Sequence, residues 1–346
     1  MIPLSRPASV ALRFLSTLTL TGAFAGLLHA AQPSDALLDR WALTIPGGSA
    51  GWLELKKENG WYDGSILWGG GSVLPVASVT IDGDTATVTR VREVERKDAA
   101  GKVVRKQQLT ETLTAKAEGD TIRLTRLAPR PDGSGFDRAE FTGKRIPALP
   151  ARPNLSKVKY GAPVTLLGTK DLAGWRLIET NAPNGWSVTD GVLHNRPAEA
   201  APGQPKVRYG NLRTDREFED FNLTLEVNVP QGSNSGVYLR GIYEVQVFDS
   251  YGKALDLHNM GAVYSRITPT VAAEKPAGEW QTLNITLVDR HATVVLNGKT
   301  IIDNQPLAGC TGGAMWSDQF RPGPLFLQGD HGPVSYRNMV LRPVVK

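Results

Sequence analysis

Residues Asn234–His258 read NSGVYLRGIYEVQVFDSYGKALDLH, and this stretch decides the fold expected for the second half of the chain. Apolar and polar residues alternate in two short runs, Gly236–Gly241 and Ile242–Asp249. Alternation with a period of two is typical of β-strands, whose successive side chains point to opposite faces. The valines of each run would face a core, and the other face of each run is polar or charged. The stretch therefore predicts two neighbouring strands of a sheet.

Polar side chains gather on one predicted surface of these strands. Arg240, Glu244 and Gln246 are expected to share that surface, and Tyr238 has the same parity as Arg240. A surface of this kind can bind hydroxyl groups and transfer protons. The same residues can also form an exposed sheet face with a solvated ion pair, because surface ion pairs are common and contribute little. Residue types alone leave both interpretations open.

Composition narrows the class of protein. The chain has 346 residues, which favours two domains. Its 36 Gly and 23 Pro, without long helical patterns, indicate β structure with many turns. Basic residues form only a mild cluster at Arg90–Lys106, with no basic stripe and interleaved aromatics, so nucleic acid is not an expected partner. Cys310 is the only cysteine, so no internal disulfide is expected.

The N-terminus carries a candidate targeting segment. Residues 1–31 have the features of a secretory signal peptide, with Arg6 and Arg13 ahead of an uncharged apolar run. The cleavage site would be Ala30 or Ala31, although neither has a small residue two positions before it. An uncleaved membrane anchor is the alternative, but the run is short for a span. The sequence predicts export, to the periplasm rather than the medium, with no membrane contact after signal removal.

Three further regions follow. Residues 35–145 contain short alternating runs separated by turn signals such as Asn59-Gly60, which predicts a small β-barrel or sandwich domain. This region has no grouped nucleophile, base or metal ligands, which favours an accessory role. Residues 146–162 are rich in proline and are expected to form an extended linker. Residues 163–346 contain many further alternating runs, which predict two large antiparallel sheets packed together.

A set of short motifs is distributed in order along residues 163–346. The motifs are LLGTKDLAGW at Leu166–Trp175, NSGVYLR at Asn234–Arg240, YEVQVFD at Tyr243–Asp249, GAVY at Gly261–Tyr264, GEW at Gly278–Trp280, LNG at Leu296–Gly298, LFLQGDHG at Leu325–Gly332 and YRNMVLRP at Tyr336–Pro343. In this order they resemble the 3-keto-disaccharide hydrolase domain family. The region before the linker is similar to an N-terminal companion of that family.

The resemblance implies a fold and an activity. The fold is all-β, with a concanavalin A-like jelly roll at residues 163–346. The activity is cleavage of the glycosidic bond of a 3-keto-glucoside or 3-keto-disaccharide, with a separate sugar 3-dehydrogenase supplying the ketone. No cofactor is implied when the ketone arrives ready-made. The alternative is a non-catalytic carbohydrate-binding or cell-envelope module, since one fold hosts many functions.

Two mechanisms remain open for such an enzyme. A ketone at C3 acidifies the proton on C2, so a base can form an enolate that expels the C1 substituent, after which water adds to the double bond. This route needs a base, an acid for the leaving oxygen and a donor for the enolate oxygen. The other mechanism is hydrolysis by two carboxylates.

Site residues are assigned on the same resemblance. Glu244 is the expected acid or base, and Arg240 would hold substrate oxygens or the enolate; a structural ion pair between the two is the alternative. Asp249 is the candidate second carboxylate, or else a turn cap, and His331 is a candidate base or acid. Asp249 and Asp256 with loop carbonyls are a candidate calcium site, and no other metal set has a clear spacing. The expected substrate-binding residues are Asn234, Ser235, Tyr238, Gln246, Tyr264, Trp316 and Gln328.

Overall fold

The computed structural model describes residues 33–198 and 207–345, in which strands dominate and every strand pairing is antiparallel. The helices among these residues are two short 3₁₀ turns, η1 (Pro33–Leu37) and η2 (Leu155–Lys157). This confirms the all-β class. No helix in the described ranges is long and apolar enough to cross a membrane. The expected signal peptide, residues 1–31, lies outside the described residues.

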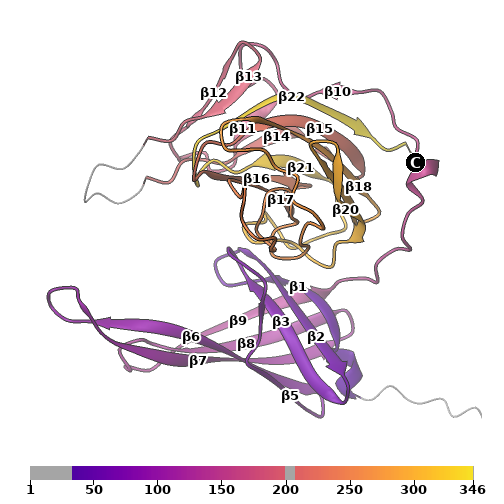
Figure 1. The fold of residues 1–346 in the computed structure, drawn as a ribbon. Coiled ribbons are helices and arrows are strands. Elements are labelled where there is room, and N and C mark those ends of the chain that lie inside the picture. The colour runs from indigo at the N-terminus through magenta and orange to yellow at the C-terminus, as the bar shows by residue number, and fades with distance from the viewer. Residues whose placement is uncertain (1–32, 199–206, 346) are drawn as a thin grey trace, which may run out of the picture. The chain divides into compact units, whose positions relative to one another are not determined.

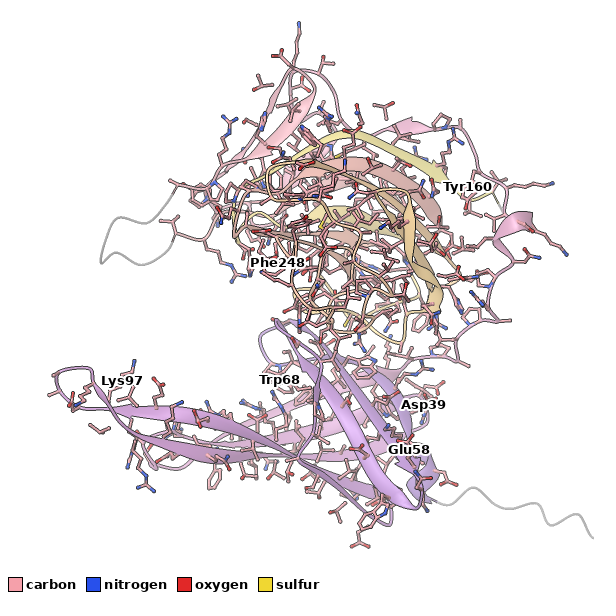
Figure 2. The ribbon with its side chains drawn as sticks, viewed as in Figure 1. Asp39, Glu58, Trp68, Lys97, Tyr160 and Phe248 are labelled. Atoms are coloured by element: carbon pink, nitrogen blue, oxygen red, sulfur yellow. The ribbon has the colours of Figure 1, made fainter. Side chains whose placement is uncertain are left out.

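The first region is one antiparallel sheet (Figure 1). Its strands are β1 (Asp39–Thr44), β2 (Ala50–Glu58), β3 (Trp61–Trp68), β4 (Leu74–Pro75), β5 (Ser78–Asp82), β6 (Thr85–Lys97), β7 (Val103–Glu118), β8 (Thr121–Pro129) and β9 (Phe136–Arg145). They are ordered β4-β3-β2-β1-β9-β8-β7-β6-β5. β6 and β7 form a long hairpin, with Lys97 at the end of β6 (Figure 2).

The sheet of the first region curls around its own apolar core, so that β3 also contacts β5. Trp41, Leu53, Val88 and Leu113 are fully buried there. On the opposite face of β1, β2 and β3, Ala42, Trp52 and Leu67 are buried against the core of the second region. Burial of one face of each strand explains the alternating sequence pattern. The predicted barrel or sandwich is therefore a single curled sheet.

The linker is held by side chains of the second region. It contains η2, whose first turn is capped by the side chain of Asn154. Arg290 Nη2 donates to the carbonyl of Ala148 at 2.6 Å, and Asn304 Nδ2 donates to the carbonyl of Pro153 at 2.8 Å. These bonds fix backbone groups of the linker, which is therefore more ordered than an extended spacer needs to be. The residues from Pro33 onward form one compact unit.

The second region is a sandwich of two antiparallel sheets, the jelly roll that the sequence predicts (Figure 1). One sheet has the order β12-β13-β22-β15-β18-β19-β20, with β10 on β22, and the other has the order β11-β14-β21-β16-β17. The strands are β10 (Val164–Thr165), β11 (Trp175–Leu177), β12 (Trp186–Thr189), β13 (Val192–Asn195), β14 (Leu212–Phe218), β15 (Phe221–Asn228), β16 (Asn234–Leu239), β17 (Tyr243–Phe248), β18 (Trp280–Val288), β19 (His291–Leu296), β20 (Lys299–Pro306), β21 (Gly323–Leu327) and β22 (Val334–Pro343).

The core of the sandwich follows from strand alternation. Leu223, Leu225 and Val227 of β15 are fully buried, whereas the residues between them are only half-buried. Val237 of β16 and Val245 of β17 are buried in the same core from the facing sheet. The valines of the hairpin thus lie where their parity predicts. Their neighbours on the opposite face of β16 and β17 are consequently directed away from this core.

The hairpin β16–β17 has a tight turn at Arg240 and Gly241, whose φ angles are +56° and +70°. Ile242 N donates to the carbonyl of Leu239 at 3.1 Å, which closes the turn. In the strand register Leu239 pairs with Tyr243, so three residues, Arg240 to Ile242, connect the two strands. The expectation that the first strand runs through Arg240 is therefore wrong, because β16 ends at Leu239 and Arg240 is a turn residue.

Candidate active site

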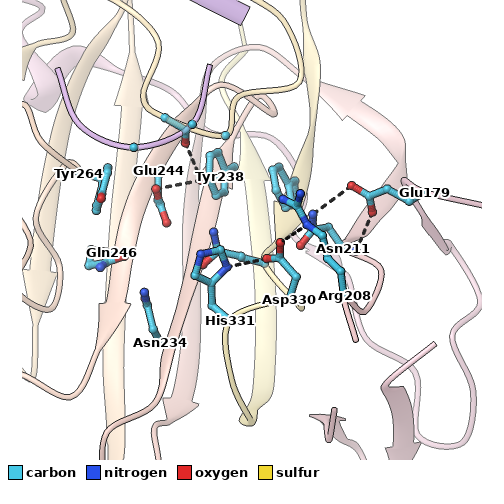
Figure 3. Close-up of a pocket in the computed structure, with 16 residues that line it drawn as sticks. Glu179, Arg208, Asn211, Asn234, Tyr238, Glu244, Gln246, Tyr264, Asp330 and His331 are labelled. Carbon is cyan, nitrogen blue, oxygen red and sulfur yellow. Dashed lines mark hydrogen bonds and ion pairs between the residues drawn. The ribbon is translucent and has the colours of Figure 1, made fainter. Parts of the chain in front are cut away.

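A pocket of about 330 Å³ lies over the polar face of the hairpin β16–β17 (Figure 3). β16 supplies Tyr238, and β17 supplies Glu244 and Gln246, which face it directly or diagonally in the strand register. Strand alternation puts these side chains on one surface, as the sequence predicts. The residues that follow β21 form a second wall, which includes Asp330 and His331.

Glu244 is a buried carboxyl at the base of this pocket, with 3% of its surface exposed. Its backbone N–H is bound by Thr311 Oγ1 at 2.9 Å, which fixes the strand at this residue. With its amide nitrogen turned inward, Gln246 donates to Glu244 Oε1 at 3.3 Å. The pKa of Glu244 is raised to about 8: burial is the main cause, a hydrogen bond from Tyr238 opposes it, and the negative charge of Asp330 adds to it.

Two glycines allow side chains to reach the centre of the pocket. A Cβ at Gly236 would lie 2.2 Å from Glu244 Oε1, and a Cβ at Gly313 would lie 2.8 Å from Tyr238 Oη. Both distances are shorter than the contacts that real Cβ atoms make. Gly236 stands opposite Gln246 in the register, so its missing side chain leaves the space that the Glu244 carboxyl fills.

The Tyr238 hydroxyl has two acceptors and one proton. Its oxygen lies 2.8 Å from Glu244 Oε2 and 2.7 Å from the carbonyl oxygen of Gly312. A carbonyl can only accept, and a hydroxyl has a single proton to donate. When Tyr238 donates to Gly312, the bond to Glu244 requires the proton to be on the carboxyl. When Glu244 is ionised, Tyr238 donates to it and the Gly312 carbonyl loses its partner. Both geometry and burial thus favour a protonated Glu244.

Asp330 and His331 form a paired base on the second wall. His331 Nδ1 lies 2.6 Å from Asp330 Oδ1, and Arg208 Nε donates to Asp330 Oδ2 at 2.7 Å. Burial raises the pKa of Asp330, but the hydrogen bond and charge of His331, followed by those of Arg208, outweigh it, so the pKa lies below its usual value. An ionised Asp330 fixes the imidazole with Nδ1 as the donor. Nε2 of the half-exposed His331 is then the atom able to take a proton.

Further polar groups complete the pocket. Glu179 binds both the backbone N–H and the side chain of Asn211, at 2.9 and 3.1 Å. Gln328 has a buried Oε1 with no hydrogen-bond partner among the described residues. Asn234 and Tyr264 also line the pocket (Figure 3). Amides and a phenol of this kind suit a ligand with many hydroxyl groups.

Most of the residues expected from the sequence do line this pocket. Arg240 does not. Its guanidinium is buried and donates to the carbonyls of Gln319 at 2.7 Å and Arg321, away from Glu244. The turn conformation explains the difference, because a positive φ takes the residue out of the strand alternation. The expected residues that do line the pocket are Asn234, Tyr238, Glu244, Gln246, Tyr264, Gln328 and His331.

Three other expected residues do not line the pocket and have structural partners. Asp249 accepts a hydrogen bond from the N–H of Gly232 at 2.8 Å. It therefore caps a turn, which was the alternative to its role as the second carboxylate. Ser235 is fully buried, and its hydroxyl donates to the carbonyl of Gln328 at 2.8 Å. Trp316 packs against the sandwich core beneath the guanidinium of Arg321, which is 3.7 Å from its ring centre.

Four polar lining residues are absent from the sequence-based set. Asp330 lies next to His331 in the LFLQGDHG motif, so adjacency to a candidate base was the available signal. Arg208 and Glu179 come from connections with no strand periodicity, and Asn211 directly precedes β14. Nothing in the sequence relates these three residues to Glu244. Tertiary folding alone brings them to the pocket.

No group of three or more His, Cys, Asp and Glu side chains in residues 33–198 and 207–345 is arranged to hold a metal ion. In the candidate calcium pair, Asp256 accepts from the N–H of His258 at 2.6 Å and Asp249 caps Gly232. Each carboxylate therefore has a local structural role.

Residues 162–342 match the sequence profile of the 3-keto-alpha-glucoside-1,2-lyase-like domain. The match spans more than half of the 346 residues, so the chain belongs to this family of carbohydrate-active domains. The resemblance read from the ordered motifs is confirmed. The pocket lies within the matched range except for the backbone of Gly70 and Gly71, which the first region supplies.

Solved structures similar to this chain include two proteins from Parabacteroides distasonis that are provisionally assigned as glycosyl hydrolases. One is 26% identical with a TM-score of 0.44, over 57% of this chain and 94% of that chain. The other is 24% identical with a TM-score of 0.40, over 53% of this chain and 100% of that chain. A carbohydrate-binding module from Bacillus subtilis is 11% identical with a TM-score of 0.31, over 48% of this chain and 93% of that chain. A comparison with curated protein sequences gave no match.

Proposed function

We propose that this protein cleaves the glycosidic bond of 3-keto-glucosides by elimination, with His331 as the base and Glu244 as the acid. The proposal rests on two groups that share one pocket. One is His331 paired with the ionised Asp330, and the other is the buried, protonated Glu244. One group is set to accept a proton and the other to donate one. Elimination across two adjacent carbons needs that combination.

The first step breaks two bonds. Nε2 of His331 takes the proton from C2, which the neighbouring C3 ketone has acidified. The electron pair of the C2–H bond forms the C1–C2 double bond by way of the enolate. The C1–O bond breaks, and the leaving oxygen takes the proton of Glu244. After this step His331 is a cation, Glu244 is an anion, and the sugar is an unsaturated ketone.

The charge that develops on the C3 oxygen needs a donor. Arg208 is the candidate, because it lines the pocket and its Nε is bound to Asp330 while the rest of its side chain is exposed. A guanidinium has five N–H donors, so the other N–H groups can reach a ligand in the pocket. A positive group beside a developing oxyanion lowers the barrier of the step.

The second step restores both residues. Water adds at C1 while Glu244 takes its proton, and His331 returns a proton to C2. The products are the free alcohol and the 3-keto sugar, and each residue is back in its starting state. The exchange of roles uses the raised pKa of Glu244, about 8, which lets the carboxyl both give and take a proton near neutral pH.

Direct hydrolysis fits the pocket less well. A retaining or inverting enzyme needs two carboxyl groups free to act at the anomeric carbon. Two of the carboxylates that line this pocket are occupied, Asp330 by His331 and Arg208, and Glu179 by Asn211. Among the described lining residues, Glu244 is then the one carboxyl left to act on the substrate. This supports elimination over two-carboxylate hydrolysis.

The proposal also has a biological setting. A separate sugar 3-dehydrogenase would oxidise C3 beforehand, because the elimination requires a ketone already present at C3 and does not create one. Export, expected from the sequence of residues 1–31, would place the reaction in the periplasm.

The test is release of the alcohol from a 3-keto-glucoside, run beside the matching plain glucoside. Wild type should cleave only the keto compound, and Asp330→Asn should lose turnover while still binding sugar. Asp249→Asn is the matched control, since Asp249 caps a turn and does not line the pocket. Cleavage of neither compound, with sugar still bound, would support a carbohydrate-binding module instead.

A further inference from the structure

A second cavity, of about 490 Å³, adjoins the candidate active site. The two cavities share three lining residues, Gly70, Arg208 and Gly313. The second cavity continues from there along the turn between β1 and β2, at residues 47–50, and along Met315. The first region, expected to be only accessory, therefore supplies much of its wall.

The backbone around Gly70 is held in place next to the active site. Gly313 N donates to the carbonyl of Gly69 at 3.2 Å. A Cβ at Gly312 would lie 2.0 Å from the carbonyl oxygen of Gly71, so the two backbones meet with no room for a side chain. The same Gly312 carbonyl accepts from Tyr238. The loop of the first region thus contacts the segment that orients the Tyr238–Glu244 pair.

Two more bonds fix the end of this loop. Val73 N donates to Ser265 Oγ at 2.8 Å, and Ser72 Oγ lies 2.9 Å from His258 Nε2. The ring of His258 in turn packs edge-on against Tyr264, which lines the active-site pocket. The wall shared by the two cavities is therefore part of the folded structure and is not a free loop.

The wall of the second cavity exposes backbone. A Cβ built at Gly47, Gly48 or Gly70 would meet nothing within 4 Å, so peptide groups border open space there. Glycine permits such close approach of a ligand to the backbone. The other polar groups are the hydroxyl of Ser49 and the guanidinium of Arg208. Of the described residues that line this cavity, none is aromatic.

We propose that this second cavity is the leaving-group subsite and that it takes a polyhydroxylated sugar ring; this rests on the proposed function. The acid, Glu244, and the base, His331, define where the keto sugar is bound, and the cavity begins at the shared wall beside them. The peptide groups and the hydroxyl of Ser49 bind hydroxyl groups, whereas a flat aromatic leaving group would find no stacking surface. The first region then acts as a specificity element for disaccharides.

Ser49→Trp tests the subsite, because Ser49 is exposed, lies in the cavity wall and touches no active-site group. The bulky side chain would fill the cavity. Ser134→Trp is the matched control, at an exposed turn of the same sheet and outside the lining of both cavities. The substrates are a 3-keto-disaccharide and methyl 3-keto-α-glucoside, whose leaving group is too small to enter the subsite.

The expected result is a loss of about tenfold or more in kcat/KM for the disaccharide in Ser49→Trp, with the methyl glucoside unchanged, because the leaving sugar contributes binding energy only in the free cavity. Ser134→Trp should match wild type on both. An equal effect on both substrates, or no effect on either, would overturn the subsite.

Measurements of sugar binding test the leaving-group subsite independently of the proposed cleavage activity. If wild type cleaves neither substrate, the dissociation constants of the plain disaccharide and of methyl α-glucoside are measured by calorimetry. If wild type binds the disaccharide more tightly than the methyl glucoside, and Ser49→Trp does not, the result supports the subsite although the proposed activity is absent. Equal affinities, or no binding of either sugar, would overturn the subsite as well.

Discussion

Replacing Glu244 with Gln should stabilise the protein and inactivate it. The carboxyl is 3% exposed, and its pKa is about 8 in the folded chain, against an ordinary value of 4.5. A carboxyl with a raised folded pKa stabilises the fold fully below pH 4.5 and loses this contribution as pH rises towards 8. At pH 7 the wild-type fold therefore bears the cost of holding a proton that the unfolded chain would release.

The magnitude follows from the difference in pKa. Each pKa unit corresponds to about 1.4 kcal/mol, so the cost is about 3 kcal/mol at pH 7 and about 5 kcal/mol above pH 8. The amide introduced by Glu244→Gln does not titrate and has nearly the same shape as the carboxyl. Relative to its value at pH 4, the free energy of unfolding of Glu244→Gln should therefore exceed that of wild type by about 3 kcal/mol at pH 7. Turnover should fall by about 10² to 10⁴, because the proton donor is lost.

The assay is urea unfolding of both proteins at pH 4 and pH 7, together with turnover at pH 7. Glu118→Gln is the control, because Glu118 is an exposed carboxyl on the first sheet. The other titrating groups are common to all three proteins and cancel in the comparison. The reasoning is refuted if the difference in stability between Glu244→Gln and wild type is the same at both pH values.

Three further results are expected. In wild type, kcat/KM should fall as pH rises through about 8, because Glu244 then loses the proton it donates. Gly236→Ala should abolish most turnover, since its Cβ would lie 2.2 Å from Glu244 Oε1 and must displace the carboxyl. Arg240→Ala should destabilise the fold by about 2 to 3 kcal/mol and leave turnover largely intact, because its buried guanidinium binds the carbonyls of Gln319 and Arg321.

These experiments have matched controls. Gly168→Ala serves for Gly236, because a Cβ there meets its nearest neighbour at an ordinary 3.7 Å. Arg152→Ala serves for Arg240, since that side chain is largely exposed. Normal turnover in the Gly236 variant, or loss of turnover without loss of stability in the Arg240 variant, would contradict the assigned roles. A pH profile that stays flat through pH 8 would contradict the role of Glu244.

Strand alternation in the sequence was sufficient to predict the part of the site that lies within strands. Tyr238, Glu244 and Gln246 share a face because β16 and β17 are regular, and their parity is visible in the sequence. Arg240 has the same parity as Tyr238, but a positive φ places it in the turn, where parity has no meaning. The rule therefore fails one residue after the strand ends, and the end of a strand is not encoded by its alternation.

The loop-borne part of the site could not be derived in this way. Arg208 and Glu179 reach the pocket through connections that have no period, and Arg208 meets Asp330 from 122 positions away in the sequence. Contacts of this kind depend on how the whole sandwich is connected. The contribution of Gly70 and Gly71 was equally hidden, because these residues bring only backbone, and a glycine run by itself indicates no more than a turn.

The central claim is that the bond is cleaved by removal of the C2 proton. The most direct measurement uses a 3-keto-glucoside carrying deuterium at C2, cleaved in ordinary water, with the deuterium content of the product sugar read by mass spectrometry. Parallel samples without enzyme and with Glu244→Gln correct for spontaneous exchange. Elimination and rehydration predict that wild type cleaves the deuterated substrate more slowly than the ordinary one. They also predict that the product loses its deuterium, because the half-exposed imidazolium of His331 exchanges with water before C2 is reprotonated. Product that retains its deuterium and forms at the same rate from both substrates would show direct cleavage at C1 and would contradict the account.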